Sequence, residues 1–186
     1  MTKLNQPIND VINARHSVRT YDGETKISHS EMQTMLKTAF LAPSALNLQP
    51  IRALVIESAM VRQQLATATG NTSQLTTASA VVLFVNDREN LTEAKPFAPS
   101  QQTGVAEHLD IAALDCGLVA MQFMLTAKDH GYDTNPMTGF DHAGFSHILN
   151  LDANRYEPLL LVSIGRARQA GRMAKHKALK TLVDFR

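Results

Sequence analysis

Four side chains that could bind an anion or carry a proton are crowded into residues 15–19. Arg15, His16, Ser17 and Arg19 stand at the expected end of the first helix, just before the turn-forming sequence YDG. Arginine at this position faces the negative end of the helix dipole, which is one explanation for the pattern. Two guanidiniums that flank a hydroxyl also match a phosphate group, because the planar forks give bidentate contacts and the hydroxyl adds a neutral donor.

A second group of polar side chains stands in APSALNLQP, residues 42–50, between an expected helix and an expected strand. Ser44, Asn47 and Gln49 supply donors and acceptors suited to the edge of a heterocycle. Pro43 would keep this part of the backbone rigid. The same composition is also typical of a connecting loop, which needs no ligand to explain it.

Two further stretches are not explained by packing. In NPMTGFD, residues 135–141, Gly139 would let the backbone approach another molecule closely, just before a helix begins. The basic tail, residues 166–180, holds six of the 18 Lys and Arg residues and no acid. Such a run is usually a solvated face, but it could also neutralise a phosphate.

Several common catalytic motifs are absent. The chain has no GxGxxG, no Walker loop and no GxSxG sequence. His142 and His147 lie five residues apart on an expected helix, on different faces, so no metal site is expected. The single cysteine, Cys116, excludes an intrachain disulfide and a Cys-based zinc site, and its apolar surroundings indicate a buried side chain. If the chain is an enzyme, its difficult chemistry is expected to come from a bound cofactor.

The apolar periodicity indicates the elements that would carry these residues. Ser28 and Glu31 form a capping box, with Ile27 and Met32 as a hydrophobic staple. The expected order is a helix at 7–15, a helix from Ser28 to Pro43, a strand at 51–57, a helix from Ser58 to Gly70, a strand at 80–86, a polar loop at 87–104, a helix at 108–131, a helix capped by Asp141 and a strand at 158–165. This order indicates a mixed α/β or α+β fold.

The segment 108–131 is expected to be a helix that is apolar on almost every side. Asp110, Asp115 and Lys128 make it too charged for a membrane span. Such a helix must be covered all round, so it is either the central helix of the core or the contact with a second subunit. His130 at its end is expected to be a surface or capping residue.

Length and composition are those of a globular protein. At 186 residues, with 44% hydrophobic and 19% charged residues, the chain is expected to form a single domain over 1–186. A net charge of +1 gives no overall attraction for nucleic acid. Because the N-terminal residues lack the apolar run of a signal peptide, we expect a cytoplasmic location.

Taken in order along the chain, these stretches resemble the FMN-dependent nitroreductase family. The resemblance covers most of the chain and is carried by RHSVRTYD, APSALNLQP, NTSQLTTASAVVLFV, TGFD, LLLVSIG and the basic tail. Their order and separations are specific for family and fold, and much less so for substrate. The resemblance implies an α+β fold with a mixed, mainly antiparallel sheet wrapped by helices. It also implies a homodimer with two FMN sites at the subunit interface.

The resemblance further implies which residues of one subunit surround the flavin. They are Arg15 and Ser17 at or near the phosphate, His16 beside them, Arg19 nearer the pyrimidine side of the ring, Asn71 on the pyrimidine edge, Gln74 near the ring, and Thr138 and Gly139 against it, with the Gly139 N–H toward N5. Three positions depart from the common family pattern. Gln74 replaces a lysine, Thr138 a glutamate, and Ile51 an aromatic residue.

The remaining implied contacts come from elsewhere. From the other subunit, the loop with Pro43, Ser44, Asn47 and Gln49 would reach the same flavin. In the basic tail, Lys175 and Lys177 match a pair that closes the phosphate site, and Arg172 is the alternative. In the loop 87–104, Phe97 would either line the acceptor site or simply pack.

The implied activity is transfer of hydride from NADH or NADPH, through bound FMN, to nitro compounds, quinones or similar electron-poor acceptors in a ping-pong reaction. A cation such as Arg19 near the ring would favour reduction of the flavin. Two alternatives keep the cofactor: a related flavoprotein that dehydrogenates, dehalogenates or degrades flavin, and a flavin-binding protein with little turnover. A third is contact with nucleic acid through residues 166–180. The acceptor and the preferred nicotinamide stay open.

Overall fold

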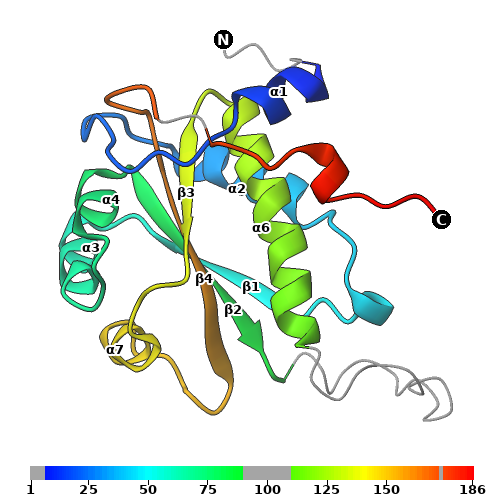
Figure 1. The fold of residues 1–186 in the computed structure, drawn as a ribbon. Coiled ribbons are helices and arrows are strands. Elements are labelled where there is room, and N and C mark those ends of the chain that lie inside the picture. The colour runs from blue at the N-terminus through cyan, green and yellow to red at the C-terminus, as the bar shows by residue number, and fades with distance from the viewer. Residues whose placement is uncertain (1–6, 90–109, 172–173) are drawn as a thin grey trace, which may run out of the picture.

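The computed structural model describes residues 7–89, 110–171 and 174–186 (Figure 1). The strands are β1 (Ile51–Ile56), β2 (Ala80–Asp87), β3 (Asp133–Met137) and β4 (Tyr156–Gly165). The helices are α1 (Ile8–Ala14), α2 (His29–Ala39), α3 (Ala59–Ala66), α4 (Thr72–Thr77), α6 (Ile111–Asp129) and α7 (His142–Ile148), with short 3-10 turns η1 (Ala45–Asn47) and η3 (Leu179–Thr181).

The strands form one sheet in the order β1-β2-β4-β3, and every neighbouring pair is antiparallel. All eight residues of β2 are buried, because helices cover both faces of the sheet. Val82 and Phe84 face α2 and α6, whereas Val81 and Leu83 face α3, α4 and α7. Figure 1 shows α6 lying across one face of this sheet. The expected fold of mainly antiparallel strands wrapped by helices is confirmed.

β3 was not expected from the sequence. The sequence predicts no element over Asn135, Pro136 and Met137, but they form part of a strand that pairs with β4. A proline has no backbone N–H and removes a hydrogen bond from the ladder, so it argues against an interior strand. Pro136 is tolerated here because β3 is an outer strand of the sheet.

α4 was also missed, because its sequence TSQLTT carries one large apolar side chain and several β-branched residues. Its backbone is supported by local side-chain bonds, from Thr76 Oγ1 to the Thr72 carbonyl at 3.0 Å and from Thr77 Oγ1 to the Ser73 carbonyl at 2.7 Å. The preceding helix, α3, ends at Ala66, before the expected limit at Gly70.

The capping box at the start of α2 forms only in part. The Glu31 N–H donates to Ser28 Oγ at 3.2 Å, as expected. The Glu31 carboxylate instead accepts a hydrogen bond from Tyr132 Oη at 2.9 Å and lies 3.4 Å from His130 Nδ1. These bonds tie α2 to the end of α6. Of the two expected roles of His130, the capping role is confirmed, because it is the C-cap residue of α6, and the surface position is wrong, because it is buried.

The apolar surface of α6 is buried on one side of the helix and exposed on the other. Among the described helices it is the one long and apolar enough to cross a membrane, with a mean hydropathy of 1.4 over a window that is 39% buried. One side packs on the sheet and includes Cys116, and burial raises the pKa of this thiol to about 12. The other side exposes Leu114, Leu118 and Met121. In α1, likewise, Val11 is buried but Ile8 and Ile12 are exposed.

A buried ion cluster closes the end of β2. The Asp87 side chain is fully buried and accepts hydrogen bonds from Arg155 Nε at 2.9 Å and Arg155 Nη2 at 3.0 Å. Arg52 on β1 also pairs with this carboxylate, and the Glu89 N–H donates to it at 3.2 Å. These bonds hold the pKa of Asp87 at about 2, and they join β1, β2 and the start of β4.

Candidate functional site

The segment with Arg15, His16, Ser17 and Arg19 leaves α1 and runs beside the outer strand β3. Arg15 is the C-cap residue of α1, and its N–H donates to the Val11 carbonyl at 3.0 Å. Ser17 then bridges Thr134 of β3, and the Val18 N–H donates to the Thr134 carbonyl at 3.0 Å. The block therefore does not continue the helix, and it is extended along the edge of the sheet.

The start of the basic tail pairs with this block. The Asp22 N–H donates to the Arg166 carbonyl at 2.9 Å, and the Arg168 N–H donates to the Thr20 carbonyl at 3.1 Å. Tyr21, between these two bonds, is buried and donates from Oη to the Ser163 carbonyl at 3.1 Å. Two segments that lie far apart in the sequence are thus fixed side by side.

His16 fastens the two segments together. Its Nδ1 lies 3.0 Å from the Ala14 carbonyl, and its Nε2 lies 3.1 Å from the Gly171 N–H. Because a carbonyl can only accept and an N–H can only donate, the arrangement fits a neutral imidazole protonated at Nδ1. A Cβ at Gly171 would lie 2.3 Å from His16 Cδ2, so this approach requires a glycine. Both ring nitrogens of His16 are used within the protein.

The paired segments enclose a cavity of about 420 Å³. Ser17, Arg19 and Thr20 line one side, and Gln169, Ala170 and Gly171 line the other. Within the described part of the chain, no hydrogen bond or ion pair engages the guanidiniums of Arg15 and Arg19 or the hydroxyl of Ser17. Arg19 and Ser17 therefore border the cavity with a cationic and a neutral donor that are available to a ligand, and Arg15 lies next to this lining in the sequence.

A second group of the expected residues forms a hydrogen-bond network beside the end of β3. Gln74 is buried and donates from Nε2 to Asn71 Oδ1 at 3.1 Å. Asn71 Nδ2 in turn donates to the Gly139 carbonyl at 3.2 Å and to Thr69 Oγ1 at 3.0 Å. Thr69 Oγ1 donates to the same Gly139 carbonyl at 2.8 Å. Thr138 is exposed next to this network.

The network is joined to the arginine-containing block. Thr20 Oγ1 lies 3.2 Å from Ser73 Oγ, and the Tyr21 N–H donates to Thr77 Oγ1 at 3.0 Å. α4 is thereby held against the block, with Asn71 at its N-cap. Thr69, Thr20 and Ser73 were not identified from the sequence. Threonine and serine in these positions carry no motif, and only their tertiary contacts reveal them.

The loop with Pro43, Ser44, Asn47 and Gln49 lies elsewhere. It precedes β1, the outer strand opposite β3, and η1 is far from the block in Figure 1. The loop holds itself in shape, because the Gln49 N–H donates to Ser44 Oγ at 3.1 Å and Gln49 Nε2 donates to Asn47 Oδ1 at 3.0 Å.

α6 also anchors this loop. The Ala45 N–H donates to the buried Asp115 carboxylate at 3.0 Å. Leu46, Asn47 and Gln49 have positive φ angles of 52°, 56° and 50°. Residues other than glycine rarely adopt this backbone conformation, so the loop is held in a defined and unusual shape. Within one chain the structure does not bring this loop to the block.

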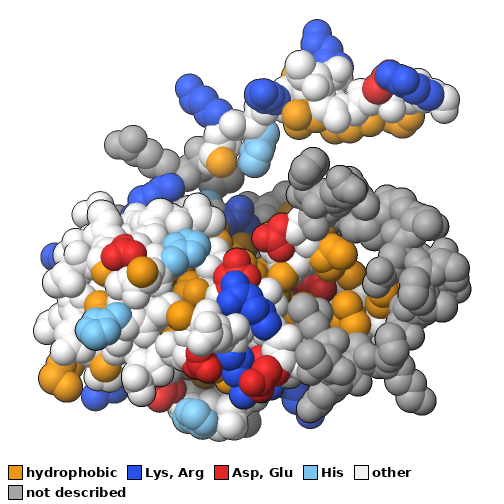
Figure 2. Space-filling view, turned by 90° about the horizontal axis from the view of Figure 1, so that it is seen from below, with side chains coloured by type: hydrophobic (Ala, Val, Ile, Leu, Met, Phe, Trp, Pro, Cys, Tyr) orange, Lys and Arg blue, Asp and Glu red, His pale blue; other side chains and the backbone are white. Residues whose placement is uncertain are grey.

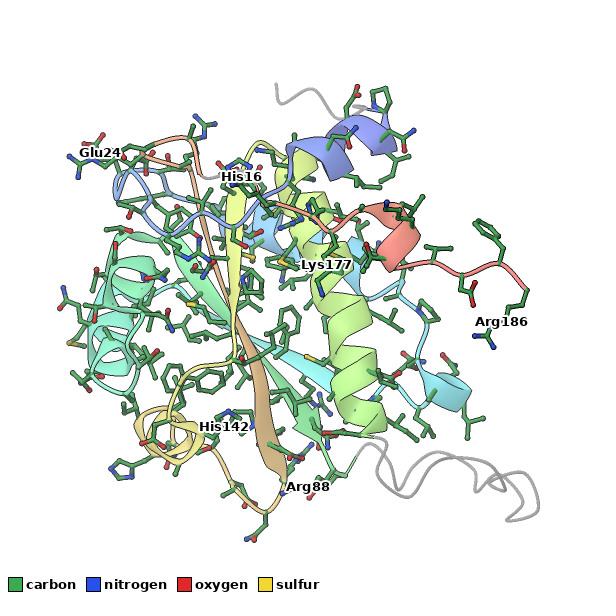
Figure 3. All side chains as sticks on the ribbon, in the orientation of Figure 1. His16, Glu24, Arg88, His142, Lys177 and Arg186 are labelled. Carbon is green, nitrogen blue, oxygen red and sulfur yellow. The ribbon has the colours of Figure 1, made fainter. Side chains whose placement is uncertain are left out.

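The tail cations beyond Gly171 extend away from the block. Lys175 and Lys177 are exposed, and neither has a hydrogen bond or ion pair to any residue that the structure describes. Figure 3 shows His16 beside β3 and Lys177 on the separate C-terminal segment. Arg172, the alternative phosphate ligand, lies outside the described residues, as do Phe97 and most of the loop 87–104.

No metal site competes with this interpretation among the described residues. No group of three or more His, Cys, Asp or Glu side chains there is placed to hold an ion. His142 and His147 both line a different cavity, of about 490 Å³, at the start of β4. Figure 3 shows His142 at the end of the molecule remote from His16.

Comparison with known proteins gives the family. The model of the nitroreductase family matches residues 12–166. A Bacillus subtilis (strain 168) protein with the provisional name NAD(P)H nitroreductase YdgI is 35% identical, over 95% of this chain and 96% of its own length. The enone reductase of CLA biosynthesis from Lactiplantibacillus plantarum is 32% identical, over 98% of this chain and 95% of its own length.

Solved structures agree with the sequence relatives. A crystal structure from Exiguobacterium sibiricum, provisionally described as a nitroreductase in complex with FMN, superposes with a TM-score of 0.85. It is 32% identical, and the match covers all of both chains. From the extent of the family match and these identities, the chain belongs to the nitroreductase family.

Proposed function

We propose that this protein is an FMN-dependent oxidoreductase that passes electrons from NADH or NADPH to nitro compounds, quinones or similar electron-poor acceptors. The observation that carries the proposal is the juxtaposition, beside β3, of the available cations Arg15 and Arg19 with the network of Asn71, Gln74 and Gly139. The family supports it, because one solved relative contains FMN and others are named as NAD(P)H-dependent reductases.

The donor set fits the two ends of FMN. Arg15 and Ser17 offer a planar fork and a hydroxyl, a set that suits a phosphate dianion. At the other end, a Cβ built on Gly139 would meet nothing within 4 Å, so a flat ring has room against this backbone. Asn71 beside it would offer the second lone pair of Oδ1 to the ring edge, because its Nδ2 donates to Thr69 and Gly139 and its Oδ1 accepts one bond from Gln74.

Bound FMN supplies hydride transfer, a reaction that no side chain at this site can perform alone. The residues of the chain bind and orient the reactants. Gln74 fixes which way the Asn71 amide points, because Asn71 Oδ1 accepts its hydrogen bond. Asn71 and Thr69 occupy the Gly139 carbonyl, which fixes the orientation of that peptide. Arg19, which lines the cavity, would supply a positive charge that favours the anionic, reduced form of a ring bound beside it.

The test begins with the cofactor and ends with the acceptor. We expect the denatured protein to release FMN and not FAD, and NADH or NADPH to bleach the bound flavin under anaerobic conditions. The reduced protein is then mixed with a nitroarene, a quinone and a conjugated enone. The enone is included as a second acceptor class because one relative is named an enone reductase. Failure to retain FMN after reconstitution, or to be reduced by either nicotinamide, would contradict the proposal.

A homodimer is part of this proposal, because the chain leaves extensive apolar surface uncovered. Leu114, Leu118 and Met121 are exposed on α6, and Leu41 is exposed at the start of the loop before η1. In the C-terminal segment, residues 174–186, four large apolar side chains are exposed: Leu179, Leu182, Val183 and Phe185. Figure 2 shows this segment standing away from the body, with hydrophobic side chains on the side that faces it. A second chain on α6 would cover these surfaces.

The dimer also explains the two separated parts of the candidate site. The loop with Ser44, Asn47 and Gln49 and the block with Arg15 lie at opposite edges of the sheet. In a two-fold dimer built on α6, the loop of one chain can reach the block of the other. The proposed cofactor site is then made of both chains.

Replacing Leu118 with glutamate is expected to convert the dimer into monomers and to remove bound FMN. The charge would have to be buried against apolar side chains of the partner, which is unfavourable. Sedimentation velocity at low micromolar concentration measures the change. Met60→Glu is the control, since Met60 is also exposed but lies on α3, in the layer on the other side of the sheet. A monomeric wild-type protein that binds FMN would contradict the shared site.

Replacing Gln74 with lysine is expected to raise the flavin midpoint potential by roughly 20 mV. Two unit charges about 4 Å apart interact by roughly 4 kcal/mol at an effective dielectric of 20, and solvent screening should reduce this to about 1 kcal/mol. For a two-electron couple, about 30 mV corresponds to ~1.4 kcal/mol. The lysine can still donate to Asn71, and Gln74→Glu should lower the potential. Dye-equilibration titration measures both; if both variants keep FMN and neither shifts, Gln74 is not beside the ring.

A further inference from the structure

A second polar cavity, of about 340 Å³, lies apart from the cofactor site. It forms where the loop after the opening block meets the first turns of α2 and α3 and the residues before β2. Its lining includes Lys26, His29, Glu57, Ala59, Arg62 and Ser79. None of the residues assigned to the flavin contributes to it.

Arg62 is the unusual member of this lining. It is 6% exposed, although arginine is rarely buried without a carboxylate partner. Its Nε donates to the Leu75 carbonyl at 3.1 Å, and its Nη1 donates to the Glu57 carbonyl. Its Nη2 finds no acceptor within residues 7–89, 110–171 and 174–186. Two neutral carbonyls therefore hold this guanidinium, and Arg62 lines the cavity.

The charge of this guanidinium is not neutralised by the protein. Burial lowers the pKa of Arg62, and no carboxylate acts in the opposite direction. Leaving a buried charge without a partner is costly, so a counter-ion in the cavity would stabilise the fold.

Two helix starts and a lysine at the cavity also favour an anion, whereas two acids of the lining, Glu24 and Glu57, oppose it. His29 and Ala59 are the first residues of α2 and α3, so the positive ends of two helix dipoles face it. Lys26 adds a cation at the rim. Of the two acids, Glu57 has its Oε1 3.5 Å from His29 Nδ1. Figure 3 shows Glu24 at the outer edge of its loop.

We infer that this cavity is a binding site for a phosphate group, which would accept hydrogen bonds from Arg62 Nη2 and from N–H groups at the starts of α2 and α3. The phosphate can be the free ion or the end group of a small phosphate ester, because the volume exceeds that of the ion alone. The inference involves residues other than those assigned to FMN, and only the use of FMN-saturated protein in its test rests on the proposed function.

The test is isothermal titration of the protein saturated with FMN, so that the block at residues 15–19 does not take up the titrant. Inorganic phosphate and glycerol phosphate are titrated at constant ionic strength, with chloride as the reference anion. We expect saturable binding of one equivalent. Tighter binding of glycerol phosphate would identify an ester as the ligand, and tighter binding of inorganic phosphate would identify the free ion. If neither binds more tightly than chloride, the site is refuted.

Two variants place the binding in this cavity. Ala59→Glu puts a carboxylate at the lining and should weaken phosphate binding at least tenfold. Met60→Glu puts the same charge one residue further along the first turn of α3, outside the lining, and should leave the affinity within about twofold. Arg62→Lys should weaken binding about tenfold, the effect typical of losing one charged hydrogen bond. Equal affinity in Ala59→Glu and Met60→Glu would show that the phosphate binds elsewhere. This comparison tests the site even if Arg62→Lys does not fold.

Discussion

Replacing Arg15 with alanine is expected to weaken FMN binding by roughly ten- to a hundredfold. Loss of a hydrogen bond to a charged group typically costs about 1.5–3 kcal/mol, and each ~1.4 kcal/mol is a factor of ten in affinity. Arg15 suits this role because its guanidinium has no partner among the described residues. Fluorescence titration of the apoprotein with FMN gives the dissociation constant.

Arg168→Ala is the matched control for this experiment. Arg168 is exposed, and the contact that holds it, with the Thr20 carbonyl, is made by its backbone N–H and survives the substitution. Its removal is expected to change the affinity by less than about twofold, as for a solvated charge. If both variants retained FMN equally, Arg15 would be only a helix-end cation.

Replacing Asp87 with asparagine is expected to destabilise the fold by about 3 kcal/mol. Removing one partner from a buried ion pair leaves the other charge uncompensated, at a typical cost of ~3–5 kcal/mol. We expect the lower end, because Arg52 and Arg155 are partly exposed and can regain water. For a chain of this size the loss corresponds to a fall in Tm of roughly 6–12 °C. Calorimetry measures it, and Asp184→Asn, which removes an exposed pair with Arg186, should change Tm little.

The same cluster predicts how stability responds to acid. The pKa of Asp87 is lowered from 3.8 to about 2 by its arginine partners, so its stabilisation is complete above its unfolded-state pKa and is lost as the pH falls through about 2. The free energy of unfolding of the wild type, measured with urea between pH 5 and pH 2, should therefore fall more steeply with decreasing pH at the acidic end. The Asp87→Asn variant should lack this contribution, and identical pH dependence of both proteins would mean that Asp87 is not the titrating group.

Elements with a strong local signal could be predicted from the sequence. β2, β4 and α6 are long apolar runs, and each forms close to its expected limits. β3 and α4 could not be predicted, since Pro136 and the threonines of α4 have the wrong local preferences and depend on partners far along the chain.

The candidate site shows the same division. The polar types in residues 15–19 and 71–74 are visible in the sequence, and the structure brings these two stretches together. Their connection is not visible. The pairing of His16 with Gly171 and the bonds of Thr69 to Gly139 join residues more than 60 positions apart. The contact of the loop 43–49 with the same cofactor depends on a second chain, and stays a prediction.

The placement of Arg15 and Asn47 at opposite edges of the sheet has a genetic consequence for the proposed shared site. A mixed dimer of one chain with Arg15→Ala and one with Asn47→Ala would concentrate both defects in one of its two sites. The other site would receive its arginine and its asparagine from the two unaltered halves. Cells that produce both variants should therefore regain activity that neither variant shows alone, which is the behaviour known as intragenic complementation.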